Sequence, residues 1–470
     1  MRLSAYLLLF LFICETVSLP ALAQNISATE GNITSLPTLQ GIRLPEIFAA
    51  PGASNSSATV ARYFNLQQGV SSGDLIRRAL AANAELAAAR LDIERGRARI
   101  AQAKLRPNPS IDFEQTTGQL TGSKGEREIS IGFSLPLELG GKRQRRIDLA
   151  QIELAAAEAE VAERERLLVR EIHFAHLDAL TSLRELQITE RLTTIDTQTG
   201  RIIEARVTEG DSSPLELSLI RVETDRLKAR RSLIEGRLQT AFLKLKRLTG
   251  IAPNQALRVR ESLLTPLPLL EPSLSIEDAI DIALKTRPDV RLARIFEEAA
   301  RAGLRLAQAQ ATPDLIAFSK YSVNRSLFDD TPVGVLRDKD KLLTFGVSIS
   351  LPFFNRNQGA KAEAEIAIQQ TQRRRKFVEA TVRSEVAAAY AQYEAARNSL
   401  AIFEKGVIER SAQNIRAISL AYELGAFSLT ELLSEQRRLL DSEREFIEAL
   451  AERYRALTEI QSAIGTGTNK

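Results

Sequence analysis

The sequence predicts a mainly α-helical chain with a small β part, built from two similar halves. Three observations support this fold class. First, the 470 residues include no tryptophan and only 5% aromatic residues, while alanine, leucine, glutamate and arginine abound, as is typical of long helices and coiled coils. Second, a long internal repeat divides the chain. Third, short segments in each half alternate apolar and polar residues with a period of two, as strands do.

The internal repeat extends over most of the chain. Residues spread over 71–109 recur 204 positions later, over 275–313, and the motif Gly-x-x-Ser-x-x-Glu at 210–216 recurs at 425–431. A unit of this length is too long for a solenoid repeat, so we expect two fused halves. The predicted segments are 71–250 (first half), 251–274 (proline-rich connector), 275–466 (second half) and 467–470 (C-terminal tail).

Residues 1–23 have the features of a secretory signal peptide. Arg2 precedes an apolar run, and Ala-Leu-Ala at 21–23 supplies the small-residue cleavage pattern. Cleavage at this point removes Cys14, the only cysteine, so we expect neither a disulfide nor a lipid anchor in the mature chain. Residues 24–70 are rich in Ser, Asn, Gly and Pro, and we expect an extended N-terminal segment there.

Each half predicts the same order of elements. A helix opens with Ser-x-x-Asp, close to a capping box, and two strands, a long helix, a tight turn and a returning helix follow. Residues 142–199 contain neither glycine nor proline, which at about 1.5 Å per residue gives a coiled-coil rod of roughly 85 Å. The first half is expected to have helices at 72–105, 142–199 and 214–249 and strands at 109–117 and 128–137. The second half is expected to have helices at 276–311, 360–424 and 429–464 and strands at 314–324 and 341–352.

Composition and charge argue against several classes of function. The 63 basic residues are nearly balanced by 59 acidic ones, and the two signs alternate along helical stretches. We therefore interpret the charges as solvated helix faces and expect no nucleic-acid binding. No phosphate loop, nucleophile elbow or zinc-protease motif occurs, so we expect no enzyme activity, catalytic residue or cofactor. His173 and His176 lie three apart on the long helix without a third ligand nearby, and we predict no metal site.

The alternation of apolar and polar residues in the strands predicts that the β part lies in a membrane. In the second half, Leu343, Phe345 and Val347 alternate with threonine, glycine and serine. The small polar face suits a water-filled lumen, the apolar face suits lipid, and the length of about ten residues matches membrane-spanning strands. Four strands cannot close a barrel, and an open edge in lipid leaves amides whose lost hydrogen bonds cost several kcal/mol each. We therefore expect several chains to share one barrel, with a half-buried sheet in a soluble protein as the alternative.

The segments that leave the two strand pairs carry the sharpest motifs. They are Leu-Pro-Leu-Glu-Leu-Gly-Gly-Lys-Arg at 135–143 and Leu-Pro-Phe-Phe-Asn-Arg-Asn-Gln-Gly at 351–359. With the duplicated order of elements, they resemble the TolC family of outer-membrane efflux proteins over about 70–466, and within it the heavy-metal (cobalt–zinc–cadmium) branch. The resemblance implies a homotrimer with a shared transmembrane β-barrel in outer-membrane lipid and a periplasmic α-barrel of long helices. It also implies a periplasmic adaptor (membrane fusion protein) and an inner-membrane pump of the resistance-nodulation-division type.

The two helix-returning turns are the candidate functional site. Locally, glycine ends one helix, serine caps the next, and glutamate completes a capping box. The resemblance implies in addition that these turns form the periplasmic tip of the channel, where a ring of glutamates would attract cations. The candidates for the pore constriction are Glu431, Ser434 and Glu216, and those for adaptor contact are Gly210, Ser213, Pro214, Gly425, Phe427 and Ser428.

The function expected from these observations is that of a passive exit duct in the outer membrane of a Gram-negative cell, extending into the periplasm. Heavy-metal cations are the expected cargo. Two alternatives stay open. A duct for drugs or secreted protein would share the fold and differ in its pump. A soluble periplasmic coiled-coil scaffold would explain the helices but not the alternating strands.

Overall fold

The computed structural model describes residues 58–465, apart from 119, 121, 123–125, 266, 268–271 and 329–335. The chain divides into two units, Met1–Arg43 and Leu44–Lys470, and all described residues belong to the second. The predicted signal peptide, most of the predicted N-terminal segment and the predicted C-terminal tail lie outside the described residues.

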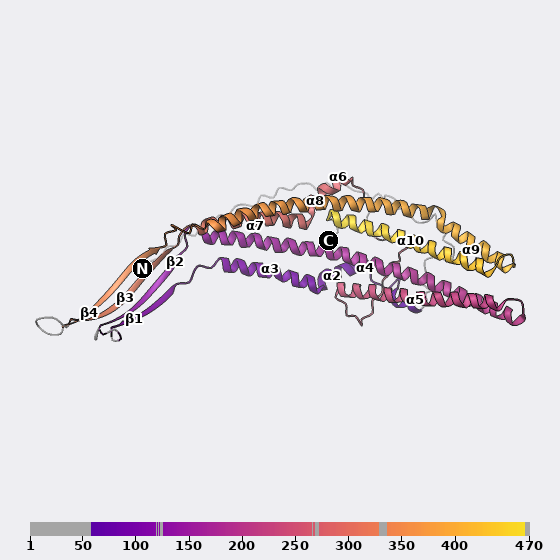
Figure 1. Ribbon diagram of the computed structural model, residues 1–470, viewed down its shortest axis with the longest axis horizontal. Helices are drawn as coiled ribbons and strands as arrows, with labels where there is room; N and C mark the ends of the chain where they lie inside the picture. The colour runs from indigo at the N-terminus through magenta and orange to yellow at the C-terminus, as the bar shows by residue number, and fades with distance from the viewer. Residues whose placement is uncertain are drawn as a thin grey trace, which may run out of the picture. The chain divides into compact units, whose positions relative to one another are not determined.

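The described chain consists of helices and one four-stranded sheet, in a duplicated order (Figure 1). The first half contains α1 (Ala58–Tyr63), α2 (Ser72–Ala82), α3 (Ala84–Ala103), β1 (Ser110–Thr117), β2 (Arg127–Leu137), α4 (Lys142–Glu209) and α5 (Pro214–Thr249). The second contains α6 (Ile276–Thr286), α7 (Pro288–Gln310), β3 (Leu315–Phe328), β4 (Leu336–Ile349), α8 (Gln358–Ile402), a π-helical turn (Phe403–Val407), α9 (Ile408–Glu423) and α10 (Leu429–Ile464). The predicted fold class is confirmed.

The two predicted helices that precede the strand pairs are each divided into two. The helix expected at 72–105 is interrupted at Asn83, whose side-chain oxygen accepts a hydrogen bond from the N–H of Leu86 at 2.9 Å and whose amide donates to the carbonyl of Leu248 at 3.0 Å. Asparagine is a strong N-cap, so it begins α3 and ends α2. The helix expected at 276–311 is interrupted before Pro288, because proline lacks an N–H and disfavours the helical conformation in the residue before it.

The long helices also differ from the prediction. α4 passes through Gly200 and ends at Glu209, beyond the end predicted at residue 199, because only Gly210, at φ 85°, takes the left-handed conformation that terminates it. The helix expected at 360–424 is kinked at Gly406, where φ is 133°. A side chain rarely adopts this φ, so glycine permits the π-helical turn between α8 and α9. None of the helices in the described part of the chain combines the length and apolar composition of a membrane span.

Two segments expected to be irregular contribute to the core. The predicted extended segment 24–70 includes the helix α1, and Phe64 and Val70 each form a parallel bridge to Val259 of the connector. Val259 is fully buried. The connector therefore fixes the residues before α2 against the helices as well as joining the two halves.

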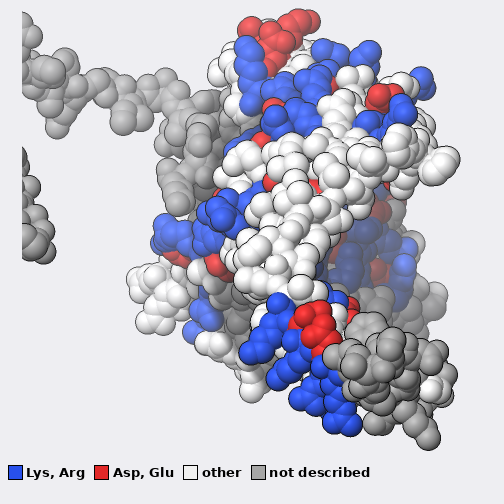
Figure 2. All heavy atoms as spheres, turned by 90° about the vertical axis from the view of Figure 1, so that its left-hand side faces the viewer, with Lys and Arg blue, Asp and Glu red and all other residues white. Residues whose placement is uncertain are grey.

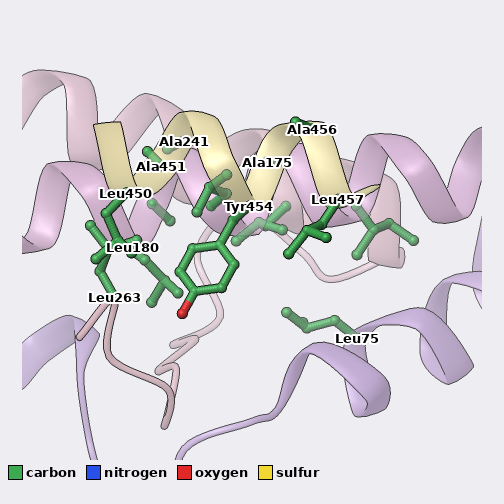
Figure 3. Close-up of a cluster of buried hydrophobic side chains, with 14 of the residues drawn as sticks. Leu75, Ala175, Leu180, Ala241, Leu263, Leu450, Ala451, Tyr454, Ala456 and Leu457 are labelled. Carbon is green, nitrogen blue, oxygen red and sulfur yellow. The ribbon is translucent and has the colours of Figure 1, made fainter. Parts of the chain in front are cut away.

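The main core lies between the long helices. Figure 3 shows Leu450, Tyr454 and Leu457, which follow one face of α10, close to Leu180 of α4 and Leu263 of the connector. Spacings of three and four residues place these side chains on one face of a helix. All of these residues are 5% exposed or less. The long helix α4, predicted as a coiled-coil rod, is therefore buried in part against the returning helix of the other half.

Candidate functional site

The sheet has one apolar face that nothing in the described chain covers. Its strands run antiparallel in the order β1-β2-β3-β4, so β2 and β3 join the two halves. Pairing aligns Phe113, Ile131, Tyr321 and Leu343 in one row. Phe113 is 68% exposed, and Val347, on the same face of β4, is 69% exposed. A patch of this kind on a folded chain marks a surface that is covered in use.

The opposite face of the sheet is mostly polar, although it also carries Ile316, Phe318 and Leu342. Its residues include Ser110, Asp112, Glu114, Ser130, Ser134, Lys320, Ser322, Thr344 and Ser348. Lys320 reaches across β2 to Glu114, with its Nζ 2.6 Å from Oε2. This contact is possible because Gly132, which lies beside Lys320, has no side chain. The two faces therefore have the character that sequence alternation predicts for lipid and lumen.

The two outer strands of the sheet each have one unpaired edge. Within the described residues, β1 pairs only with β2, and β4 pairs only with β3. β4 is 14 residues long and extended throughout. Backbone N–H and C=O groups along such an edge need water or another strand.

The second helix-returning turn has the predicted capping box. Gly425 ends the preceding helix at φ 73°, and Ser428 caps α10. The backbone N–H of Ser428 donates to Glu431 Oε2 at 2.8 Å, and its hydroxyl donates to the same oxygen at 2.9 Å. These bonds hold the pKa of Glu431 below its usual value, the backbone bond most of all. Glu431 and Ser434 are both exposed, one helical turn apart.

The first turn is built differently, and the capping box expected there is wrong. The Ser213 hydroxyl accepts from the N–H of Leu215 at 3.2 Å, and Pro214 occupies the first position of α5. Glu216 instead accepts a hydrogen bond from the hydroxyl of Ser212. It also lies close enough to Tyr422 to raise the pKa of that phenol, although burial is the larger cause. Proline already fixes the start of α5, so the glutamate is not needed there.

The structure therefore separates the two candidate glutamates. Glu431 faces solvent, whereas Glu216 is half-buried and lies near Tyr422 of α9. Beneath the turns, α4, α5, α9 and α10 share a small apolar cluster centred on Ile203, Ile220 and Leu429. The adaptor-contact candidates are all exposed: Gly210, Ser213, Pro214, Gly425, Phe427 and Ser428. The cluster holds the two turns at the same end of the helices (Figure 1).

Sequence reasoning missed a set of charges buried between the long helices. Asp196 is 1% exposed, and its pKa is raised to about 6, first by burial and then by the carboxylate of Glu223. Glu223 is held by Arg437 of α10 at 2.7 Å. Glu443, also 1% exposed, has its pKa raised to about 7 by burial, against the opposing charge of Arg184. The sequence does contain a sign of this buried charge. Asp196 follows Leu192 by four residues, so the two side chains lie on the same face of α4.

The two histidines lie inside the helical bundle. The pKa of His173 is lowered to about 4, first by burial and then by the neighbouring His176. The Nε2 of His176 is 3.3 Å from Oε2 of Glu261 in the connector. The described residues contain no group of three or more His, Cys, Asp and Glu side chains that could hold a metal ion. The histidine contact therefore serves to join α4 to the connector.

Comparison with known proteins gives a consistent result. The sequence matches the family described as "Outer membrane efflux protein" over residues 75–251 and 279–466. It is 24% identical over 392 residues to the cobalt-zinc-cadmium resistance protein CzcC of Cupriavidus metallidurans, covering 82% of this chain and 88% of that protein. It is 25% identical over 462 residues to the pyoverdine export outer membrane protein OpmQ of Pseudomonas aeruginosa, covering 92% and 93% of the two chains.

Solved structures show the same fold. CusC, whose structures concern folding and transmembrane channel formation, superposes with a TM-score of 0.69 at 21% identity, covering 90% of this chain and 98% of CusC. The open state of the MtrE outer membrane channel of Neisseria gonorrhoeae has a TM-score of 0.68 at 19% identity, covering 84% and 89% of the two chains.

Proposed function

Because the chain belongs to the outer membrane efflux protein family, we propose that it is the outer-membrane subunit of a tripartite efflux system that exports heavy-metal cations. Members of this family are channels rather than enzymes. The chain is accordingly a non-catalytic efflux protein, and its functional parts are surfaces and a passage.

The observation that carries the proposal is the amphipathic sheet with two unpaired edges. The apolar face, on which Phe113 is 68% and Phe345 is 74% exposed, is stable in contact with lipid. An unpaired strand edge is not stable there, because its backbone groups have no water to bind. Pairing β4 of one copy with β1 of the next removes both edges at once. Three copies then give a closed barrel of about twelve strands, within the range for such barrels. The polar face, with the ion pair of Lys320 and Glu114, lines the lumen.

The two turns at the far ends of the helices form the periplasmic mouth. Exposed Phe427 (42%) and the backbone around Gly210 and Gly425 offer the surface for a periplasmic adaptor. The adaptor connects the channel to an inner-membrane pump of the resistance-nodulation-division type. Glu431, being exposed and ionised, is the better candidate for a ring that attracts cations, and Ser434 lies one turn behind it.

Heavy-metal cargo is supported by similarity to a cobalt-zinc-cadmium resistance protein. A second cargo class, small organic molecules such as siderophores, is favoured by the similarity to a pyoverdine export protein, which covers more of the chain. A deletion strain separates the two. Lower tolerance of Co²⁺, Zn²⁺ or Cd²⁺, restored by the intact gene, supports metal export. Unchanged metal tolerance with loss of siderophore export supports the second class.

Assembly is tested directly on purified protein from outer-membrane fractions. We expect a detergent-stable trimer that forms ion-conducting channels in planar bilayers. A protein that fractionates with soluble periplasmic contents, or a monomer without conductance, would contradict the proposal and favour a coiled-coil scaffold.

Export is part of the same proposal. Residues 1–23 direct the chain across the inner membrane and are then removed, so the mature protein begins near Gln24 without an acyl chain. Intact-mass measurement checks this, and a mass that includes the leader or a lipid would contradict it.

A further inference from the structure

Three basic residues from three adjacent strands lie in one row on the apolar side of the sheet. The pairing places Arg127 of β2 opposite Arg325 of β3, and Arg325 opposite Lys339 of β4. Neighbouring strands are about 4.8 Å apart, so the three side chains are direct neighbours. Lys341 and Arg337 lie two residues to either side of Lys339 on the same face. All five are exposed.

The same part of the sheet keeps its acidic residues on the other face. Residues 337–341 read Arg-Asp-Lys-Asp-Lys, so alternation sends the cations to the apolar side and the aspartates to the polar side. Glu128 and Asp340 lie in one register row there, with Asn324 between them. Figure 2, which looks onto this end of the molecule, shows Lys and Arg side chains gathered together at the lower part of the surface.

The acidic neighbours of the row, Glu128, Asp338 and Asp340, lie on the other face of the sheet. No ion pair joins Arg127, Arg325 or Lys339 to a described carboxylate. Like charges directly opposite each other in a sheet are destabilising. A row of three such residues therefore calls for an external anion that can meet several of them together.

The row lies where the apolar band ends. On β2 the outward apolar residues run from Ile129 to Leu137, and on β4 and its extension from Leu343 to Leu351. Each stretch spans nine residues, which at about 3.3 Å per residue and a tilt of about 45° gives roughly 21 Å, close to the height of a lipid-facing band. The next outward positions are Arg127 and Lys341, at the level of the lipid headgroups.

We propose that Arg127, Arg325 and Lys339, with Lys341 and Arg337, bind the phosphate groups of the phosphorylated glycolipid in the outer leaflet of the membrane. This inference rests on the proposed function, which places the apolar face in lipid. Arginine guanidinium groups pair with phosphate oxygens through two hydrogen bonds, and lysine adds a point charge. Three neighbouring cations match a headgroup with two phosphates better than a lipid with one.

The test measures lipid binding by the full-length trimer. Purified trimer is titrated with bis-phosphorylated lipid A and followed by native mass spectrometry. Each cation near an anionic surface contributes about fivefold in affinity, so the triple variant R127Q/R325Q/K339Q should bind about 100-fold more weakly. Lipid A stripped of its phosphates should bind wild type and triple variant equally. Equal binding of bis-phosphorylated lipid A by both proteins would overturn the proposal.

Matched controls separate the possible causes. The variant K244Q/R373Q/K376Q removes three exposed helical charges away from the sheet and should bind lipid A like wild type; a comparable loss of binding in it would refute a specific site. Inorganic phosphate at millimolar concentration should not compete, and full competition would identify a free-phosphate site instead. Trimer mass and channel conductance report on the proposed function separately. If both are intact and binding is unchanged by the triple variant, only the lipid site is refuted.

Discussion

The carboxylate of Glu431 accepts hydrogen bonds from both the backbone N–H and the hydroxyl of Ser428, at 2.8 and 2.9 Å. One oxygen, Oε2, takes both bonds, and the residue remains exposed. The same side chain therefore fixes the start of α10 and presents negative charge at the tip. In the first turn, Glu216 lies instead beside Ser212 and Tyr422. The two turns share a motif but not the direction of their glutamates.

Replacing Glu431 with glutamine should lower the cation preference of the channel without unfolding it. Glutamine keeps an oxygen that can accept from Ser428 and removes three negative charges per trimer. Single-channel recording in a salt gradient measures the preference as a reversal potential. Glu216→Gln is the matched control and should change the reversal potential less. An unchanged reversal potential in Glu431→Gln, with normal conductance, would show that Glu431 serves only as a cap.

Opposite effects are expected for lysine at two neighbouring positions of β4. Val347 lies on the apolar face, so Val347→Lys should cost about 2–4 kcal/mol if the site is near the bilayer midplane. Ser348 lies on the polar face, and Ser348→Lys should be tolerated. The amount of heat-modifiable trimer in outer-membrane fractions measures both. Greater sensitivity at Ser348 would reverse the assignment of the two faces.

The stability of the helical region should depend on pH through Asp196. Its folded pKa, about 6, lies above the ordinary aspartate value of 3.8. The protonated form therefore stabilises the fold at low pH, and that contribution is lost as pH rises from about 4 through 6. The shift corresponds to at most about 3 kcal/mol per chain. The melting temperature of the helices should therefore fall less between pH 4 and 7 in Asp196→Asn than in the wild-type protein. Asp225→Asn, at an exposed position of α5, should leave the decline unchanged.

Two glycines that end helices should respond differently to alanine. Gly250 has φ 67°, and a Cβ there would lie 2.6 Å from the carbonyl oxygen of Ala82, a backbone atom that cannot easily move. Gly210 has φ 85° with nothing within 4 Å of a Cβ. The left-handed conformation alone costs alanine about 1–2 kcal/mol. Gly210→Ala should lose about this amount in chemical denaturation and Gly250→Ala clearly more, and equal losses would contradict the contact with Ala82.

Most features of the fold that the sequence predicts follow from patterns within short stretches of the chain. The two halves, the four strands and the positions of Gly210 and Gly425 follow from spacing and from residue chemistry within a few neighbours. The alternation of Leu343, Phe345 and Val347 likewise predicts one apolar face before any pairing is known. Periodicity is a property of the strand or helix itself, so the sequence alone reveals it.

Features that depend on contacts between residues distant in the sequence are visible only in the tertiary structure. The cap at Asn83 is completed by a hydrogen bond to the distant carbonyl of Leu248, and the raised pKa of Asp196 depends on burial and on Glu223 of α5. The row of Arg127, Arg325 and Lys339 depends on strand register across the two halves. A shift of one residue would send each cation to the other face. Such alignments are set by the packing of the whole chain, which no local pattern in the sequence encodes.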